Sequence, residues 1–210
     1  MKLLLSGGGN PEAVVPLDKL FASQIDLNKP VLCIPVAMEA HVYSYEECFA
    51  WFKETYRTYG IVNADVCTDL LLAPDLDKYT AIFIGGGNTF KLLKEIKDSG
   101  FDRKLLEYLN NGGFVYGSSA GAIIFGESIK PCEYGDFSDI NHVGLTDLSG
   151  LNLAGGKDIF CHHSDADNHI VKDYHNDAYL LYEESGVFLN GDKIETVGKP
   201  FLLKAEHAFE

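Results

Sequence analysis

The chain has 210 residues, of which 46% are hydrophobic and 23% charged, as in one well-buried domain and unlike a disordered or repetitive chain. The 17 basic and 31 acidic residues give a formal net charge of −14 at pH 7. Because this charge repels nucleic acid and anionic membranes, we expect neither as a partner.

The five cysteines are widely spaced and form no Cys-x-x-Cys motif, which predicts reduced and mostly buried thiols. Only Leu3, Leu4 and Leu5 form an apolar segment before the first glycines, too short for the core of a signal peptide. No apolar run is long enough for a membrane span. We therefore expect a cytoplasmic protein. We also expect that it needs no cofactor and that it is a monomer or a homodimer.

Apolar runs and segments of helical period alternate along the first 125 residues. The predicted strands cover 2–6, 30–36, 65–72 and 81–84, with a further one beginning at Phe114. The predicted helices cover 13–23, 45–59, 89–96 and 101–110. This alternation predicts a single α/β domain over 1–210, with a doubly wound, mostly parallel sheet flanked by helices and connecting loops at its carboxyl edge.

Turn residues dominate positions 127–156, which predicts a loop-rich connection with β-hairpin character. The elements expected after it are short: a strand at 158–161, a helical segment at 170–176, and strands at 178–182 and 186–189. The turn signal Asn190-Gly191-Asp192 predicts a hairpin with the segment that begins at Lys193.

The most informative stretch is Gly117-Ser118-Ser119-Ala120-Gly121, between an apolar run and a segment compatible with a helix. It has the Gly-x-Ser-x-Gly pattern of a nucleophile elbow, so Ser119 is the candidate nucleophile. The two glycines permit a tight turn and a close approach of helix to strand. A glycine-rich connection can also simply turn the chain, so other residues must support this interpretation.

A serine nucleophile needs a base, usually an imidazole. His162 and His163 directly follow a predicted strand at the expected active edge, whereas His41, His142 and His207 lie in stretches without one. Side chains alternate along a strand, so at most one of the pair can meet Ser119. The candidate acids that could orient the base are Glu184, after a later predicted strand, and Asp136, Asp139 and Asp147, in the loop after the elbow.

A second glycine-rich loop, Gly85-Gly86-Gly87-Asn88, follows the predicted strand at 81–84. Its N–H groups could turn toward a developing oxyanion and form a two-donor hole with the N–H of Ala120. Phosphate binding is disfavoured, because the loop lacks the lysine of a P-loop and the dinucleotide spacing.

The stretch 162–169 contains His and Asp residues of metal-ligating type. However, adjacent histidines point apart and there is no His-Glu-x-x-His motif, so we expect no metal.

The segments Ile84-Gly85-Gly86-Gly87-Asn88-Thr89-Phe90-Lys91-Leu92-Leu93 and Gly117-Ser118-Ser119-Ala120-Gly121-Ala122 together resemble the serine peptidases that include dipeptidase E (aspartyl dipeptidase) and, more distantly, cyanophycinase. The resemblance extends over the whole chain. It implies a fold similar to class I glutamine amidotransferases, and hydrolysis of short peptides through an acyl-enzyme intermediate.

Carried over by motif, the resemblance implies that Ser119 is the nucleophile, that His162 is the base, and that Gly87 and Ala120 donate the oxyanion-hole N–H groups. The acid corresponds either to Glu184, which we prefer, or to Asp136. The candidate substrate-binding residues are Asn88 and His163.

One difference from dipeptidase E concerns specificity. In that enzyme the segment between the histidine and the late glutamate is longer and carries an arginine suited to a substrate aspartate. Here 163–183 contains Lys172 and further histidines but no arginine. The resemblance thus predicts a small-peptide hydrolase more firmly than aspartyl specificity. The alternatives are an amidase or esterase that uses the same residues, and a non-catalytic or signalling module that binds a small ligand.

Overall fold

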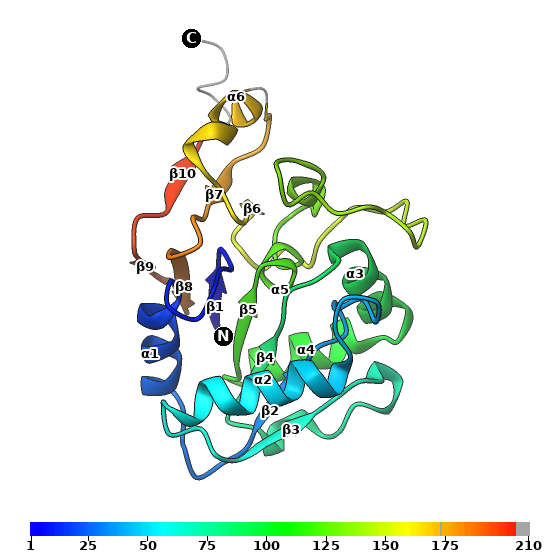
Figure 1. Cartoon of the computed structure of the whole chain (residues 1–210), viewed down its shortest axis with the longest axis vertical. Helices are drawn as coiled ribbons and strands as arrows, with labels where there is room; N and C mark the ends of the chain where they lie inside the picture. Colours follow the sequence, from blue (N-terminus) through cyan, green and yellow to red (C-terminus); the bar gives the residue numbers. More distant parts are fainter. Residues whose placement is uncertain (173, 205–210) are drawn as a thin grey trace.

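The computed structural model describes residues 1–172 and 174–204, and its centre is a seven-stranded sheet of order β3-β2-β4-β5-β1-β8-β9 (Figure 1). Its strands are β1 (Lys2–Ser6), β2 (Val31–Ile34), β3 (Ala64–Val66), β4 (Ala81–Ile84), β5 (Phe114–Ser118), β8 (Gly186–Asn190) and β9 (Lys193–Val197). The first five are parallel, whereas β8 pairs antiparallel with β1 and β9 antiparallel with β8. This confirms the predicted mostly parallel α/β fold.

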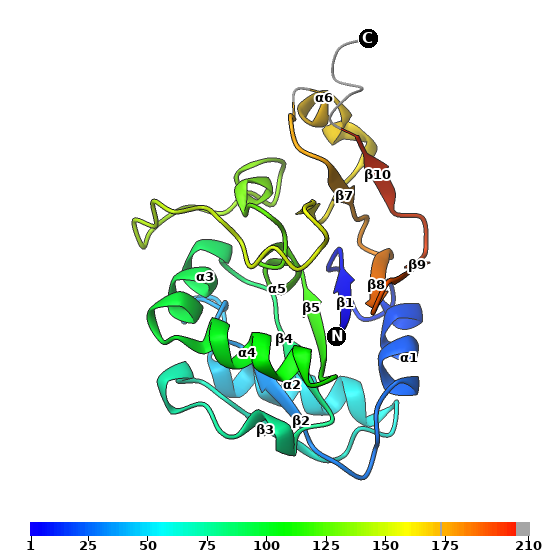
Figure 2. The ribbon, with the colours of Figure 1, turned by 180° about the vertical axis from the view of Figure 1, so that it is seen from behind.

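Helices cover both faces of this sheet (Figures 1 and 2). On one face α1 (Val15–Ser23) and α2 (Tyr45–Arg57) pack in a core that includes Leu4. On the other face α3 (Thr89–Asp98), α4 (Phe101–Asn110) and the short α5 (Ala120–Ile123) pack with Leu3 and Leu5. The central strands β2, β4 and β5 are nearly continuous apolar runs because both of their faces are buried, whereas the edge strands β3 and β9 are mostly exposed.

Two helices begin at capping residues that the sequence supplies locally. Ser44 and Glu47 form a capping box at the start of α2, in which Oε2 of Glu47 accepts from the N–H of Ser44 at 2.7 Å. Asn88 caps α3, because its Oδ1 accepts from the N–H of Lys91 at 3.0 Å.

A second, three-stranded sheet has the order β10-β7-β6. Its strands are β6 (Asp158–Phe160), β7 (Ala178–Leu180) and β10 (Phe201–Leu203), of which β10 was not expected from the sequence. Phe160, Tyr174 and Leu180 belong to its small apolar core. The buried carboxylate of Asp158 accepts hydrogen bonds from Tyr174 and Asn176. These bonds attach the segment that connects β6 to β7 to the first residue of β6.

Three segments differ from their predicted form. The strand expected at 65–72 stops at Val66, and Leu70–Leu72 forms a 3₁₀ helix that the Asp69 side chain caps. The segment 127–156 contains a 3₁₀ helix at Lys130–Glu133 and one isolated bridge, between Ser128 and Ser149, in place of a hairpin. The helix expected at 170–176 is α6 (Asn168–Val171), preceded by a 3₁₀ helix at Asp165–Asp167; residue 173 lies outside the described residues.

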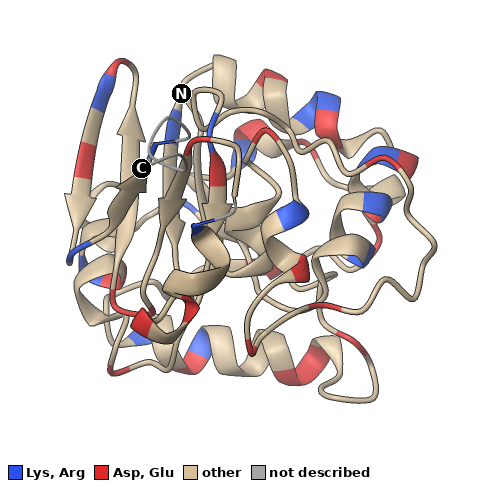
Figure 3. Ribbon diagram, turned by 90° about the horizontal axis from the view of Figure 1, so that it is seen from above, with Lys and Arg blue, Asp and Glu red and all other residues tan. Residues whose placement is uncertain are grey.

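Charged positions of both signs are interspersed along the helices in Figure 3. On α3, Lys91 pairs with Glu95 at 2.9 Å and Lys94 with Asp98 at 2.5 Å. The Lys94–Asp98 pair is the more exposed of the two, and exposed pairs contribute little to stability. None of the described helices has the length and apolarity needed to cross a membrane.

Candidate active site

Ser119 occupies a sharp turn between β5 and α5, with φ 54° and ψ −121°, a strained conformation for a residue with a side chain. The turn requires glycine on both sides of it. A Cβ at Gly117 would lie 2.1 Å from the carbonyl oxygen of Gly121, and one at Gly121 would lie 2.2 Å from that of Ile84. This close packing holds the half-buried Ser119 at the carboxyl edge of the parallel strands.

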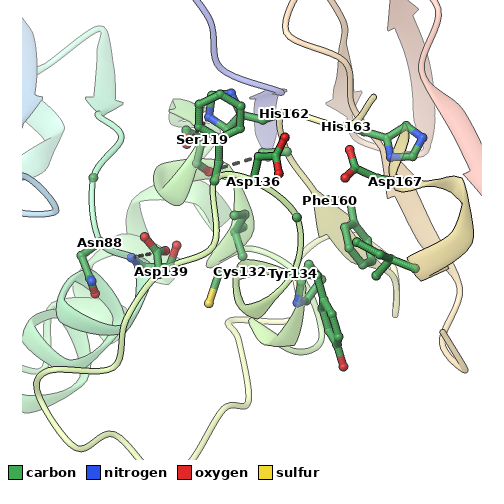
Figure 4. A pocket seen from close by; sticks show the side chains of 18 of the residues that line it. Asn88, Ser119, Cys132, Tyr134, Asp136, Asp139, Phe160, His162, His163 and Asp167 are labelled. Atoms are coloured by element: carbon green, nitrogen blue, oxygen red, sulfur yellow. Dashed lines mark hydrogen bonds between the residues drawn. The ribbon is translucent and has the colours of Figure 1, made fainter. Parts of the chain in front are cut away.

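The imidazole of His162 faces this serine, with Nε2 2.8 Å from Oγ of Ser119 (Figure 4). His162 directly follows Cys161 at the end of β6, and its N–H donates to the carbonyl of Gly7 at 2.9 Å. A Cβ at Gly8 would lie 2.5 Å from Cε1 of His162, so the glycine makes room for the ring. The predicted pair of Ser119 and His162, 43 positions apart in the chain, is therefore in hydrogen-bond contact.

The carboxylate that contacts His162 belongs to Glu183, and not to the predicted Glu184: Oε1 of Glu183 lies 3.1 Å from Nδ1 of His162. The difference arises because β7 ends at Leu180, before the predicted limit, and a turn closed by the N–H of Ser185 on the carbonyl of Tyr182 follows. In this turn Glu183 packs beside Gly9, whereas Glu184 is exposed.

The alternative acids lie elsewhere. Asp136 lines the cavity beside Ser119, but the carboxylate bonded to His162 is that of Glu183. Asp139 accepts a hydrogen bond at 2.9 Å from the N–H of Thr89, and burial raises the pKa of its carboxyl group. Asp147 pairs with Lys97 at 2.8 Å, and this hydrogen bond holds the pKa of Asp147 well below its usual value.

Two parts of the site carry no clear signal for their role in the sequence. Gly8 and Gly9 pack against His162 and Glu183. The one sequence feature that points to them is that residues 7–9, like residues 85–87, are three glycines directly after a predicted strand. Phe137, in the loop after α5, stacks on the His162 ring with centroids 4.6 Å apart and an interplanar angle of 27°. An aromatic residue in a turn-rich loop does not predict that contact.

The Gly85–Asn88 loop runs beside the nucleophile: a Cβ at Gly86 would lie 3.1 Å from that of Ser119. Gly87 has φ +137°, and a Cβ there would lie 2.4 Å from the carbonyl oxygen of Ala37. Within the described residues, the N–H groups of Gly87 and Ala120 donate to no backbone carbonyl. Ala120 begins α5, where a helix leaves its first N–H groups unpaired. Both groups can therefore donate to a ligand.

Asn88 and His163, the candidate substrate-binding residues, are each 5% exposed and line a cavity next to Ser119. Nδ2 of Asn88 donates to the carbonyl of Ile140 at 2.8 Å, so both polar groups of this side chain are bonded within the protein. His163 lies beyond His162 as seen from Ser119 in Figure 4. Burial lowers its pKa, and its Nδ1 has no hydrogen-bond partner among the described residues.

Two cavities meet at Ser119 and His162. The first, here called the acidic cavity, has a volume of about 320 Å³, and carboxylates line it: Glu39, Asp136, Asp139 and Asp167. Figure 4 labels the three aspartates. The second, the apolar cavity, has a volume of about 580 Å³ and is bounded mainly by apolar side chains: Pro35, Met38, Tyr43, Cys48, Trp51 and Phe83. The described lining of neither cavity includes a lysine or an arginine.

Other reactive groups near Ser119 are held in an inert form. Sγ of Cys161 lies 3.6 Å from the carbonyl oxygen of Ser119, and burial raises the pKa of this thiol and of Cys132 far above the usual value. Among the described residues, no three His, Cys, Asp or Glu side chains converge in a way that could hold a metal ion. In contrast to these thiols, the hydroxyl of Ser119 is in hydrogen-bond contact with an imidazole.

The model of a family described as "Peptidase family S51" matches residues 3–197. An uncharacterized peptidase of Listeria monocytogenes is 30% identical over 194 residues, which cover 87% of this chain and 92% of the relative. Peptidase E of Salmonella arizonae is 34% identical over 118 residues, covering 51% of this chain and 48% of that enzyme.

A crystal structure has the same fold. It belongs to a candidate peptidase E protein from Listeria monocytogenes and superposes with a TM-score of 0.72 at 26% identity, covering 93% of this chain and 96% of the other.

Proposed function

Because this chain belongs to peptidase family S51, we propose that it hydrolyses short peptides with Ser119 as the nucleophile. The membership confirms the predicted resemblance to the dipeptidase E family. The serine mechanism rests on one observation, the chain of contacts from Oγ of Ser119 through the two nitrogens of His162 to Glu183, at 2.8 and 3.1 Å.

In the proposed reaction Oγ of Ser119 attacks the carbonyl carbon of the peptide bond while Nε2 of His162 accepts the hydroxyl proton. Glu183 accepts a hydrogen bond from Nδ1 and stabilises the imidazolium that forms. The same Nε2 then passes the proton to the leaving amine, and an ester remains on Ser119. His162 next deprotonates a water molecule, which hydrolyses the ester and frees the serine.

The negative charge that develops on the carbonyl oxygen needs hydrogen-bond donors. We propose the N–H groups of Gly87 and Ala120 for this role, since both lack a backbone acceptor in the described residues. Ala120 directly follows Ser119, and Gly87 lines both cavities together with Ser119. Each donor of this kind contributes about 3 kcal/mol to the stability of the transition state.

The charges around the site do not favour an aspartyl substrate. An aspartate side chain needs a cation, and no described lining residue of either cavity is a lysine or arginine. The carboxylates of the acidic cavity instead suit a cationic group, such as the free α-amino group of a short peptide.

A serine-directed fluorophosphonate tests the mechanism. We expect the wild-type protein to be labelled, peptide mapping to locate the label on Ser119, and Ser119→Ala to lose both labelling and dipeptide hydrolysis while its circular dichroism is unchanged. A chelator should leave both activities intact. A folded protein that neither reacts nor hydrolyses any dipeptide would favour the ligand-binding module. Activity that survives Ser119→Ala but is abolished by the chelator would favour a metal mechanism. A panel of esters and simple amides, compared with dipeptides, distinguishes a peptidase from an esterase or an amidase.

A further inference from the structure

We propose that the apolar cavity is the subsite for a large apolar side chain of the substrate, at a residue adjoining the bond that is cut. This inference rests on the proposed function and adds the substrate class. The cavity touches both reacting groups, Ser119 and His162, and also Gly86 and Gly87 of the loop beside the nucleophile. A side chain that enters it must therefore belong to a residue next to the scissile bond.

Aromatic walls make this cavity apolar. Trp51 lies with its ring centroid 6.4 Å from that of Phe83, which rises from β4. Cys48 lies one turn before Trp51 on α2, so the two share one face of the helix. Trp51 is 44% exposed and Tyr43 is 56% exposed, so both present apolar surface to solvent at this cavity. A bound apolar side chain would remove this surface from water.

The polar groups of the cavity are either neutral or already bonded. Burial raises the pKa of the Cys33 and Cys48 thiols, which keeps them uncharged. The carboxylate of Glu47 accepts from the backbone of Ser44, and this hydrogen bond lowers its pKa. An anionic substrate side chain would lose its hydration here without gaining an opposite charge, since the described lining holds no lysine or arginine, whereas an aromatic side chain would lose little.

The volume is consistent with this occupant. The apolar cavity, at about 580 Å³, falls within the range of roughly 300–1,000 Å³ found for small-molecule sites. The substitution Cys48→Phe should narrow this cavity, so that it excludes the phenylalanine side chain of a substrate but still admits the methyl group of an alanine. Ala50, on the exposed side of the same helix, allows a matched control in which the same ring is added outside the cavity.

A binding experiment tests the subsite without turnover. Trp51 is the only tryptophan of the chain, so its emission reports on the apolar cavity. The Ser119→Ala protein is titrated with Phe-Ala, Ala-Phe and Ala-Ala. One of the two phenylalanine peptides should change the emission of Trp51 at a concentration at least about tenfold lower than Ala-Ala requires. The tighter binding of this phenylalanine peptide should be lost in the double variant Ser119→Ala, Cys48→Phe and kept in the double variant Ser119→Ala, Ala50→Phe.

A kinetic experiment tests the same subsite in the active protein. Wild-type kcat/KM for the better phenylalanine dipeptide should exceed that for Ala-Ala and for Asp-Ala at least about tenfold. This ratio should fall toward one in Cys48→Phe and persist in Ala50→Phe.

The two experiments separate the two proposals. Hydrolysis with equal kcat/KM for Phe and Ala peptides, or a preference that Cys48→Phe leaves unchanged, overturns the subsite and retains the peptidase. A selective Trp51 response to phenylalanine peptides without hydrolysis by the wild type supports the subsite and overturns the peptidase. A kcat/KM that is higher for Asp-Ala than for either phenylalanine dipeptide also overturns the subsite.

Discussion

Oε1 of Glu183 lies 3.1 Å from Nδ1 of His162, whereas the next residue, Glu184, is exposed to solvent. Two adjacent glutamates in one turn thus differ in whether they can orient the imidazole. A residue of another segment holds the backbone of this turn: the N–H of Gly7, in the loop after β1, donates to the carbonyl of Ser185 at 3.0 Å. The loop after β1 therefore helps to hold the turn in which Glu183 faces His162.

Glu183→Gln should lower kcat by about 10²-fold or more, because the amide cannot stabilise the imidazolium that forms during proton transfer. Glu184→Gln, the matched control, should retain activity within about twofold of the wild type. Steady-state hydrolysis of a dipeptide and circular dichroism of both variants provide the measurement. A loss confined to Glu184→Gln would reassign the acid to the residue that the sequence favoured.

Gly8→Ala should abolish most activity, because the added methyl group would lie 2.5 Å from Cε1 and 2.7 Å from Nε2 of His162 and displace the ring. Gly112→Ala is its control: Gly112 has φ +90°, close to the +92° of Gly8, but an added Cβ meets nothing within 4 Å. Both variants should lose a similar stability of about 1–2 kcal/mol from backbone strain. Thermal melts and kcat/KM measure the two effects, and equal activity in the two variants would contradict this role of Gly8.

Phe137→Ala should lower kcat about tenfold with little change in melting temperature, because Phe137 is 65% exposed yet stacks on the ring of His162. Without it the imidazole would be open to water and less well oriented. Phe137→Tyr should keep the stacking and the activity. If Phe137→Ala instead matches the wild type in kcat and differs only in KM, the ring serves substrate binding and not the histidine.

Asp18→Asn should stabilise the protein at neutral pH. Burial raises the pKa of Asp18 from 3.8 to about 6, despite hydrogen bonds from Tyr56 and Tyr116. The folded state thus binds this proton more tightly than the unfolded state, so the wild type loses stability as pH rises from about 4 to 6. The loss amounts to about 3 kcal/mol, from roughly 1.4 kcal/mol per pKa unit.

The Asn variant, which does not ionise, should therefore exceed the wild type in free energy of unfolding at pH 7 by up to this amount and lose the advantage below about pH 4. Urea titrations across this range provide the test. Parallel pH profiles for the two proteins would contradict it.

The sequence predicts those parts of the site that depend on local geometry. Gly117 and Gly121 reveal the elbow because the close contacts they permit involve β5, α5 and the neighbouring β4. Glu183 was missed by one position because the end of β7 depends on pairing with β6 and β10 and on the bond from Gly7 to Ser185. The stacking of Phe137 on His162 is likewise a tertiary contact across a long loop, which no residue pattern encodes.

The three residues of the proposed triad come from two different sheets: Ser119 follows β5 of the large sheet, whereas His162 and Glu183 follow β6 and β7 of the small one. The three-residue strands of the small sheet give it fewer ladder bonds. One of its faces has only a small apolar core, while Ile159 and Tyr179 on the other face pack in the main core. Partial unfolding should begin there and separate His162 from Ser119 while the large sheet is still folded. In a denaturant series, catalysis should therefore vanish at a lower concentration than the main loss of secondary structure, and it should return on dilution without global refolding.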